Sequence, residues 1–416
     1  MLKRLVLVLM AIIITTIAGG CQKGTNDVTP SEQTDTYKTD EQLPQQTETI
    51  DAIQEIIKNM TLEEKIGQMV MVGIDGYTND AHSTEMIESF HVGGFILFKN
   101  NIKNTEQAQS LINSLKDKNS NTSSIPLFFS VDEEGGRVSR MPDEFVKLPS
   151  NKVIGSRNNP DFSFEIGKVI GKEIRSLGFN MDFAPVLDVN SNPKNPVIGD
   201  RSFGNSAQLV SLLGVKTMQG LGSQNVISVV KHFPGHGDTS VDSHVGLPVV
   251  NNGMERLKKL ELVPFENAIK NNADVIMVAH ILLPKIDAQN PASFSKAIIT
   301  DLLRNDMNYN GLVITDDLTM GAITKNYKIE DAAIKAVNAG SNIILVCHDY
   351  EKQASVIKAL KAAVENGDIP AEKVYESVYK ILSLKQKYEL SDDNTGPADL
   401  QDINTEIKSV LNKYNK

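Results

Sequence analysis

The 416-residue chain contains no tryptophan, only two cysteines, and few aromatic residues, which make up 6% of the sequence. Because Cys21 lies in an N-terminal segment of different character, Cys347 alone remains for the rest of the chain, and no disulfide within the chain is expected. Cys347 ends an apolar run, residues 342–347, and is predicted to be a small buried hydrophobe. The absence of tryptophan excludes stacking of a ligand on an indole ring, so polar groups must dominate binding.

The chain also has no excess of basic residues. The chain has 42 Lys and Arg against 52 Asp and Glu, a formal net charge of -10, which argues against a nucleic-acid partner. No G-x-G-x-x-G follows the first predicted strand, and no H-E-x-x-H helix motif occurs. The hydrophobic content of 40% predicts a well-buried core, in one large domain or two modest ones.

The N-terminus reads as a targeting segment. Residues 1–20 combine a short basic start with an apolar stretch, and the small residues before Cys21 resemble a lipobox, although Ala18 stands where leucine is usual. We expect a lipoprotein signal peptide with lipidation at Cys21, and the alternative is an uncleaved N-terminal anchor. Either predicts an extracytoplasmic protein attached to the bacterial cell membrane. Residues 21–48, rich in Gln, Thr, Asp and Glu, are predicted to be a disordered tether.

From residue 49 to residue 390, short apolar runs alternate with loops and helical stretches. Helical periodicity is clear at residues 105–118 and at 330–340, where Gly340 suits a helix C-cap. The pattern predicts an α/β fold, a TIM (β/α)8 barrel with some irregularity, over an open doubly wound sheet. The polar tail, residues 391–416, should contain a short helix at 400–411, docked or frayed. The eight apolar runs begin at Ile66, Gly93, Ile125, Phe179, Asn225, Ala273, Leu312 and Asn342.

Charged residues follow several of these predicted strands. The third strand leads into VDEEGGRVSR (131–140), the fourth into LDVN, the fifth into KHFPGHGD, the sixth into His280 and the seventh into TDD (315–317). In a barrel of parallel strands these groups converge on one mouth, where active sites are built. Carboxylates and cations together suit a polyhydroxylated ligand, with sugar as the natural candidate.

Asp316 is a candidate nucleophile for glycoside hydrolysis. It follows the apolar run 312–315 directly, so a rigid strand end should hold its carboxylate. Asp317 should point the other way if the strand alternation persists. An alternative of equal weight is that Asp316 caps the helix that follows.

Asp242 and His244 form a candidate acid/base pair. Spaced at i and i+2 in an extended loop, the two side chains share a face, and the carboxylate can orient the imidazole. Gly235 and Gly237 should make the preceding loop pliable. A metal site is the rival interpretation, but the spacing is not helical, and Pro234 with the two glycines disfavours a rigid cage. The side chains available to such a site are His232, His236, Asp238, Asp242 and His244.

Four motifs together resemble glycoside hydrolase family 3, in its β-N-acetylglucosaminidase branch, over residues 50–390. They are KHFPGHGDTSVDSH (231–244), IGDRSFG (198–204), VDEEGGRVSR (131–140) and ITDDLTMGA (314–322). The resemblance implies a TIM barrel, Asp316 as the nucleophile of a covalent glycosyl-enzyme, and His244 as acid/base partnered by Asp242. It implies neither cofactor nor metal. It places substrate contacts at Asp132, Arg140, Arg201, Lys231 and His232, with Glu133, Glu134 and Arg137 as structural neighbours and Gly135 and Gly136 in a tight turn.

The activity that the resemblance implies is that of a retaining exo-β-N-acetylglucosaminidase acting on muropeptide-type cell-wall fragments. Many family members carry a second α/β domain that completes the active site, and its absence here predicts that the barrel supplies every group. A phosphorylase using the same site and a non-catalytic amino-sugar-binding lipoprotein remain as alternatives. We expect a monomer, attached to the membrane through its N-terminal lipid.

Overall fold

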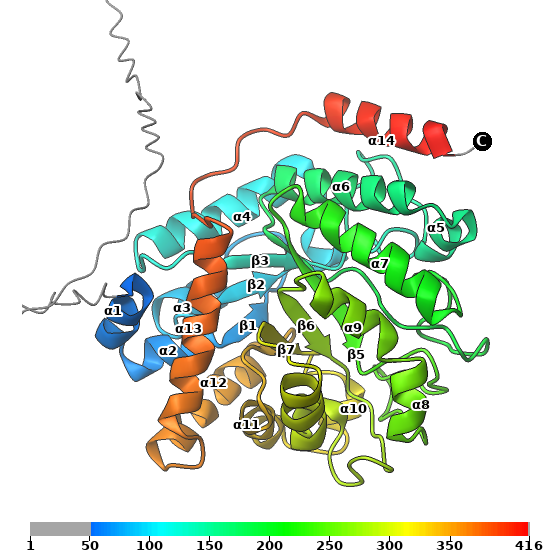
Figure 1. The fold of residues 1–416 in the computed structure, drawn as a ribbon. Helices are drawn as coiled ribbons and strands as arrows, with labels where there is room; N and C mark the ends of the chain where they lie inside the picture. Colours follow the sequence, from blue (N-terminus) through cyan, green and yellow to red (C-terminus); the bar gives the residue numbers. More distant parts are fainter. Residues whose placement is uncertain (1–50, 415–416) are drawn as a thin grey trace, which may run out of the picture. The chain divides into compact units, whose positions relative to one another are not determined.

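The computed structural model describes residues 51–414, which form a barrel of eight parallel strands surrounded by helices (Figure 1). The predicted signal peptide, Cys21 and the tether lie outside the described residues. Each strand is short and fully buried, as expected where helices cover a parallel sheet. The strands are β1 (Val70–Gly73), β2 (Gly94–Ile96), β3 (Phe128–Val131), β4 (Met181–Asp182), β5 (Ile227–Phe233), β6 (Val275–Val278), β7 (Leu312–Thr315) and β8 (Ile344–Val346).

The sheet closes on itself. Its strand order is β7-β6-β5-β4-β3-β2-β1-β8, and every strand pairing is parallel. The two ends of this order meet, because the amide of Thr315 donates to the carbonyl of Ile343 (3.1 Å) and that of Asn342 to the carbonyl of Val313 (2.8 Å). The predicted TIM barrel is therefore confirmed.

The helices begin and end at recognisable signals. Thr61 and Glu64 form a capping box at the start of α2, and Asn159 with Pro160 begins α6. Gly340, at φ 113°, ends α11 in the left-handed conformation, as predicted. The α-helices are α1 (Ala52–Asn59), α2 (Leu62–Gln68), α3 (Ala81–Glu88), α4 (Thr105–Ser120), α5 (Asn151–Arg157), α6 (Pro160–Leu177), α7 (Ala207–Gly222), α8 (Met254–Lys259), α9 (Val263–Lys270), α10 (Gly321–Thr324), α11 (Ile329–Ala339), α12 (Tyr350–Glu365), α13 (Ala371–Lys387) and α14 (Leu400–Tyr414). Three 3-10 helices, Lys99–Asn101, Gly199–Arg201 and Ala292–Phe294, and a π-helix, Ala297–Asp306, complete the described elements.

All eight predicted apolar runs overlap a strand, but three boundaries were wrong. The first run begins inside α2, whose last three residues are buried, and β1 starts only at Val70. The fourth run extends to residue 189, but β4 ends at Asp182. β5 continues through Lys231 and His232, which were expected to follow its end. These two polar residues remain in a buried strand because buried carboxylates neutralise or bond their side chains, as described below.

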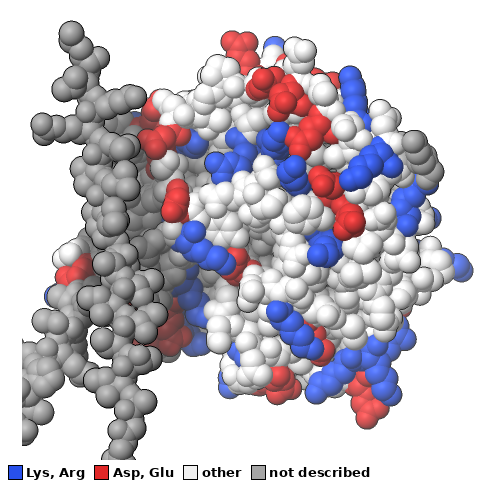
Figure 2. Space-filling model, turned by 45° about the horizontal axis from the view of Figure 1, so that its top comes forward, with Lys and Arg blue, Asp and Glu red and all other residues white. Residues whose placement is uncertain are grey.

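The C-terminal segment packs on the outside of the barrel. α14 lies against α6 (Figure 1) and buries Ile403, Ile407 and Val410, while Glu406 accepts hydrogen bonds from Lys168 and Lys172. On the face drawn in Figure 2, acidic and basic side chains are interspersed. None of the helices within residues 51–414 is both long enough and apolar enough to cross a membrane.

Candidate active site

A cavity of about 410 Å³ opens at the carboxyl ends of the strands, a size typical of small-ligand sites. Its apolar lining includes Ile96, Phe183, Met277 and Leu345. The rings of Phe98 and His348 also line it, with their centroids 5.0 Å apart. Its polar lining includes every predicted substrate-binding and catalytic residue: Asp132, Arg140, Arg201, Lys231, His232, Asp242, His244 and Asp316.

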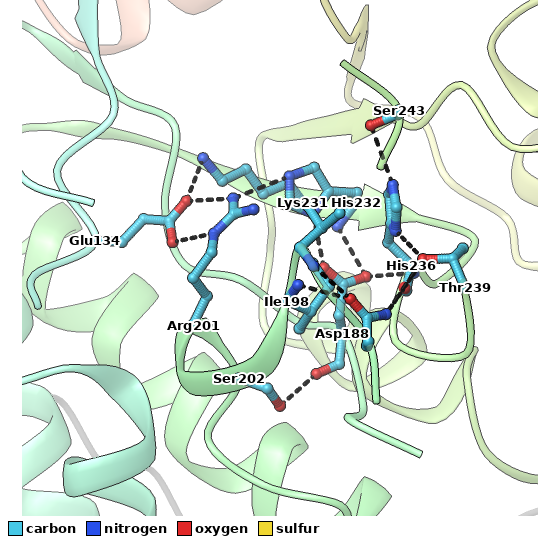
Figure 3. Close-up of polar contacts among 12 residues, drawn as sticks. Glu134, Asp188, Ile198, Arg201, Ser202, Lys231, His232, His236, Thr239 and Ser243 are labelled. Carbon is cyan, nitrogen blue, oxygen red and sulfur yellow. Dashed lines mark hydrogen bonds and ion pairs between the residues drawn. The ribbon is translucent and has the colours of Figure 1, made fainter. Parts of the chain in front are cut away.

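Four charged side chains form a cluster on one side of this cavity. Lys231 Nζ lies 2.6 Å from Asp132 Oδ1 and 2.7 Å from Glu134 Oε1. Arg201 donates two parallel hydrogen bonds to Glu134, from Nε (2.8 Å) and from Nη2 (2.7 Å), as Figure 3 shows. Such bidentate pairing fixes both side chains in orientation. Glu134, predicted only as a structural neighbour, is thus the carboxylate that holds Lys231 and Arg201 together.

Burial and ion pairing shift the pKa values of this cluster in opposite directions. Burial would raise the pKa of Glu134, but Arg201 and Lys231 hold that pKa well below its ordinary value. Burial would lower the pKa of Lys231, but Asp132 and Glu134 raise it above its ordinary value. Both side chains are therefore charged at neutral pH, and Lys231, which lines the cavity, presents a fixed charge to it.

Arg140 and Glu133 belong to the loop after β3. Arg140 Nη2 is 3.9 Å from Asp132 Oδ2, and its Nε has no hydrogen-bond partner among the described residues. The Glu133 carboxylate does not face the cavity but accepts the backbone amide of Arg140 (2.7 Å), and burial raises its pKa to about 7. Gly135 and Gly136 have φ values of 77° and 57°, so the predicted tight turn is present.

His232 is oriented by Asp188, a residue to which the sequence assigned no role. Asp188 Oδ2 lies 2.6 Å from His232 Nδ1, and its Oδ1 accepts the backbone amide of His236 (2.6 Å). His232 Nε2 then faces Arg201 Nη2 at 3.3 Å. Asp188 is fully buried in the LDVN segment, beyond the end of β4 at Asp182, and a carboxylate within a predicted apolar run was the available signal.

Asp316 follows β7 and lines the cavity. It does not cap a helix: α10 begins after Met320, and Asp316 Oδ1 accepts the amide of its neighbour Asp317 (2.9 Å). Burial would raise the pKa of Asp316, but His280, His232 and that amide lower it, so the carboxylate is ionised at neutral pH. Asp317 accepts the amides of Thr319 and Cys347, each at 2.9 Å, and shapes the loop.

Asp242 and His244 form the expected pair. His244 Nδ1 lies 2.8 Å from Asp242 Oδ1, which also accepts the His244 backbone amide at 2.9 Å. The His244 side chain is 68% exposed at the cavity rim. Burial would raise the pKa of Asp242, but the hydrogen bonds and charge of His244 bring it below its ordinary value.

The glycines before this pair have a role other than pliability. A Cβ atom on Gly237 would lie 1.8 Å from the carbonyl oxygen of Val189, and one on Gly235 2.8 Å from Glu261 Cβ. Gly235 also has φ 124°, which disfavours side chains. These glycines are therefore needed for close packing of the backbone, a role that the sequence did not indicate, and the pliability of the loop stays a prediction.

The side chains that were considered as metal ligands form hydrogen bonds with other protein groups instead. Asp238 accepts from Asn252 Nδ2 (2.9 Å), while His232 and His236 contact Asp188 and Thr239. Within residues 51–414 no group of three or more His, Cys, Asp or Glu side chains has the arrangement to hold a metal ion.

The cavity lies at the mouth of a TIM barrel and contains paired charges, an ionised carboxylate and an Asp–His pair. This combination indicates a barrel enzyme that acts on a polar small molecule or a sugar. Residues 61–384 match the model of the glycosyl hydrolase family 3 N-terminal domain. The chain belongs to glycosyl hydrolase family 3.

Curated relatives and a solved structure agree with this family assignment. Beta-hexosaminidase A of Pseudoalteromonas piscicida is 34% identical, over 79% of this chain and 61% of its own length, and the chain thus spans about three fifths of that relative. Beta-hexosaminidase of Nitrosomonas eutropha is 34% identical over 76% of this chain and 92% of its own length. The structure of a family 3 beta-N-acetylglucosaminidase from a Paenibacillus species is similar, with a TM-score of 0.80 and 40% identity over 85% of this chain and 69% of that one.

Proposed function

We propose that this protein is a retaining exo-β-N-acetylglucosaminidase that releases terminal N-acetylglucosamine from muropeptide-type cell-wall fragments. The observation that carries the proposal is that Asp316 and the Asp242–His244 pair line the same cavity as three members of the charged cluster, Asp132, Lys231 and Arg201. The names of the relatives, β-hexosaminidase and β-N-acetylglucosaminidase, support an amino-sugar substrate.

In the first chemical step the Asp316 carboxylate attacks the anomeric carbon, and the bond to the leaving oxygen breaks as His244 donates a proton to that oxygen. In the second step water attacks the same carbon, the Asp316 ester bond breaks, and His244 takes the proton of the water. Two displacements retain the configuration of the anomeric carbon. The lowered pKa of Asp316 supports its role, because a nucleophile must be ionised.

Asp242 supports proton transfer by fixing the imidazole. Its Oδ1 accepts from both the backbone amide and Nδ1 of His244, which leaves Nε2 as the atom that exchanges the proton. A neutral imidazole also serves as the base of the second step without placing another carboxylate beside Asp316.

The charged cluster would hold the hydroxyl and N-acetyl groups of the terminal sugar. Lys231, Asp132 and Arg201 already have partners, so they are oriented before the sugar arrives. Arg140 also lines the cavity, with its Nη2 3.9 Å from Asp132 Oδ2, and adds a second cation beside Lys231.

The test is turnover of a chromogenic N-acetylglucosaminide, with the first-formed anomer followed by NMR. Asp316→Asn should lose activity by about three decades or more and keep the wild-type melting temperature. A slow 2-fluoro glycosyl donor should label Asp316. Finding the label by mass spectrometry on Asp317 or Asp188 would contradict the assignment.

The two alternatives give different outcomes in the same assay. A histidine acid/base would tolerate phosphate as the attacking group, so a phosphorylase would form sugar 1-phosphate when phosphate is added. A binding lipoprotein would bind N-acetylglucosamine in calorimetry and turn over no glycoside.

We also propose extracytoplasmic attachment to the cell membrane through a lipidated Cys21, which the small residues before that cysteine support. Cys21→Ala should release or mis-process the protein and leave the isolated domain active. A cleaved variant that stays in the membrane fraction would contradict the lipid anchor.

A further inference from the structure

The loop that carries the Asp242–His244 pair, residues 238–250 and called the dyad loop below, buries Val250 at its end but exposes its other valines. Val241, Val245 and Val249 are 42%, 61% and 47% exposed. Ser243, between the two members of the pair, is only 2% exposed. Because exposed valines contribute little burial free energy, polar contacts attach the loop near the pair: those of the buried Ser243, and the hydrogen bond that Lys325 Nζ donates to the carbonyl of Val245 (2.7 Å).

Ser243 is held from two sides. Its Oγ lies 3.3 Å from His236 Nε2, and its carbonyl accepts the amide of Ala322 at 3.0 Å. Residues 242–246 form a turn rather than the extended segment that the sequence predicted: the carbonyl of Asp242 accepts the amides of Val245 (2.9 Å) and Gly246 (3.0 Å). Asp242, Ser243 and His244 all line the cavity, so a contact that holds Ser243 also fixes the position of the pair on either side of it.

His236 is itself fixed at three points, two of which Figure 3 shows together with Ser243. Its Nδ1 lies 2.8 Å from Thr239 Oγ1, its backbone amide donates to Asp188 Oδ1, and its carbonyl accepts from Asn195 Nδ2 at 2.8 Å. The ring is 1% exposed. Its surroundings include the charged or titratable groups Asp188, His232 and Asp316.

Burial, and to a smaller extent the neighbouring His232, lowers the pKa of His236 to about 4. The imidazole is therefore neutral at pH 7, with one nitrogen that donates and one that accepts. The Thr239 hydroxyl donates to the carbonyl of His236 (3.0 Å), so its oxygen accepts from Nδ1. Nε2 is then the nitrogen that accepts from the Ser243 hydroxyl.

We infer that His236 is a positioning residue whose Nε2 holds Ser243 and thereby keeps the Asp242–His244 pair directed at the cavity. The inference rests on the proposed acid/base role of His244. His236 touches no reacting atom in this role. It acts through the dyad loop, and it links the acid/base to Asp188, which also orients His232.

Three variants separate the two contacts of His236. Ser243→Ala removes the hydroxyl and leaves the backbone bond to Ala322. His236→Asn places an amide near the position of Nδ1, so the Thr239 contact can persist while the Ser243 contact is lost. His236→Gln places an amide near the position of Nε2 and can keep the Ser243 contact.

The measurement is kcat and KM with two substrates that differ in their leaving group, a disaccharide and a nitrophenyl glycoside. An acid matters more for the poor leaving group. Ser243→Ala and His236→Asn should each lower kcat for the disaccharide by about tenfold and that for the nitrophenyl glycoside by about twofold or less, with KM little changed. The double variant should be no worse than either single one, because both remove the same contact. His236→Gln should restore most of the disaccharide activity.

His244→Ala serves as the reference. It should slow the disaccharide far more than the nitrophenyl glycoside, and added azide should restore turnover of the latter, giving a glycosyl azide of retained configuration. If His244→Ala is selective but Ser243→Ala and His236→Asn match the wild type, or slow both substrates equally with a lower melting temperature, the positioning role is overturned and the proposed function stands. If His244→Ala slows both substrates equally and azide does nothing, the acid/base assignment fails, and the positioning role fails with it.

Discussion

Each end of the barrel contains a buried lysine, and the two differ in the partners that surround them. Lys231, at the carboxyl ends of the strands, is 1% exposed and lies between the carboxylates of Asp132 and Glu134. Lys385, on α13 at the amino ends, is 3% exposed, and its direct contacts within residues 51–414 are with neutral groups: Gln68 Oε1 (2.7 Å), the carbonyl of Gly93 (3.1 Å) and the ring of Phe128 (4.6 Å to its centroid).

The electrostatic consequences are opposite. Asp132 and Glu134 overcome the effect of burial and raise the pKa of Lys231, whereas burial lowers the pKa of Lys385 to about 7. A neutral amine suits its site, since it still donates hydrogen bonds to two oxygens. The comparison teaches that burial alone does not mark a functional lysine. A charged, paired lysine at the mouth supplies a fixed charge to a ligand, while an unpaired lysine at the base closes the barrel.

The largest expected difference is in activity. Lys231→Met should lower kcat/KM for a chromogenic N-acetylglucosaminide by at least about a hundredfold, because the cavity loses its buried cation and the partner of Asp132 and Glu134. Lys385→Met, the matched control, should stay within about twofold of the wild type, since it lies at the other end of the strands. A comparable loss in both variants would show that the two ends are not functionally distinct.

The next difference is in stability at pH 7. Lys231→Met leaves two carboxylates with less compensation and should lower the free energy of unfolding by about 3 kcal/mol, although Arg201 still pairs with Glu134. Lys385→Met replaces an amine, whose contacts are neutral, by an apolar side chain. It should change the free energy of unfolding by about 1 kcal/mol or less. Urea denaturation of both variants measures this. Equal destabilisation would contradict the contrast.

The third expected difference is in the pH dependence of stability. The pKa of Lys385 is lower in the folded than in the unfolded chain, so the unfolded chain binds more protons between about pH 7 and pH 10.4, and this lysine makes stability rise with pH in that window. Its contribution is lost as pH falls through about 7. The pKa of Lys231 is raised, so its contribution is present below about pH 10.4 and is lost at higher pH.

Melting temperatures measured from pH 7 to pH 10 check this expectation. Lys385→Met should gain stability relative to the wild type toward pH 7 and lose that advantage toward pH 10. A difference that stays constant with pH would show that Lys385 keeps its proton throughout this range.

The polar ends of the strands were easier to predict than the contacts among them. The motif at residues 231–244 indicated Lys231, His232, Asp242 and His244 as neighbours, and the i, i+2 spacing predicted the Asp242–His244 pair that the structure has. The reason for Gly235 and Gly237 was missed because their packing partners, Glu261 and Val189, are distant in the chain. Asp188 lay in a motif that was noted but given no role, since its partners also come from another strand.

What the sequence by itself determined is the alternation of eight apolar runs with helices, and with it the barrel, because the periodicity of burial is local and is repeated along the chain. It also determined which residue types meet at the mouth, since parallel strands bring their carboxyl ends together. Only the tertiary structure decided which charges pair: that Glu134 holds Lys231 and Arg201, that Asp188 orients His232, and that His236 contacts Ser243. Those choices depend on distances of a few ångströms between side chains from different strands, which no local pattern encodes.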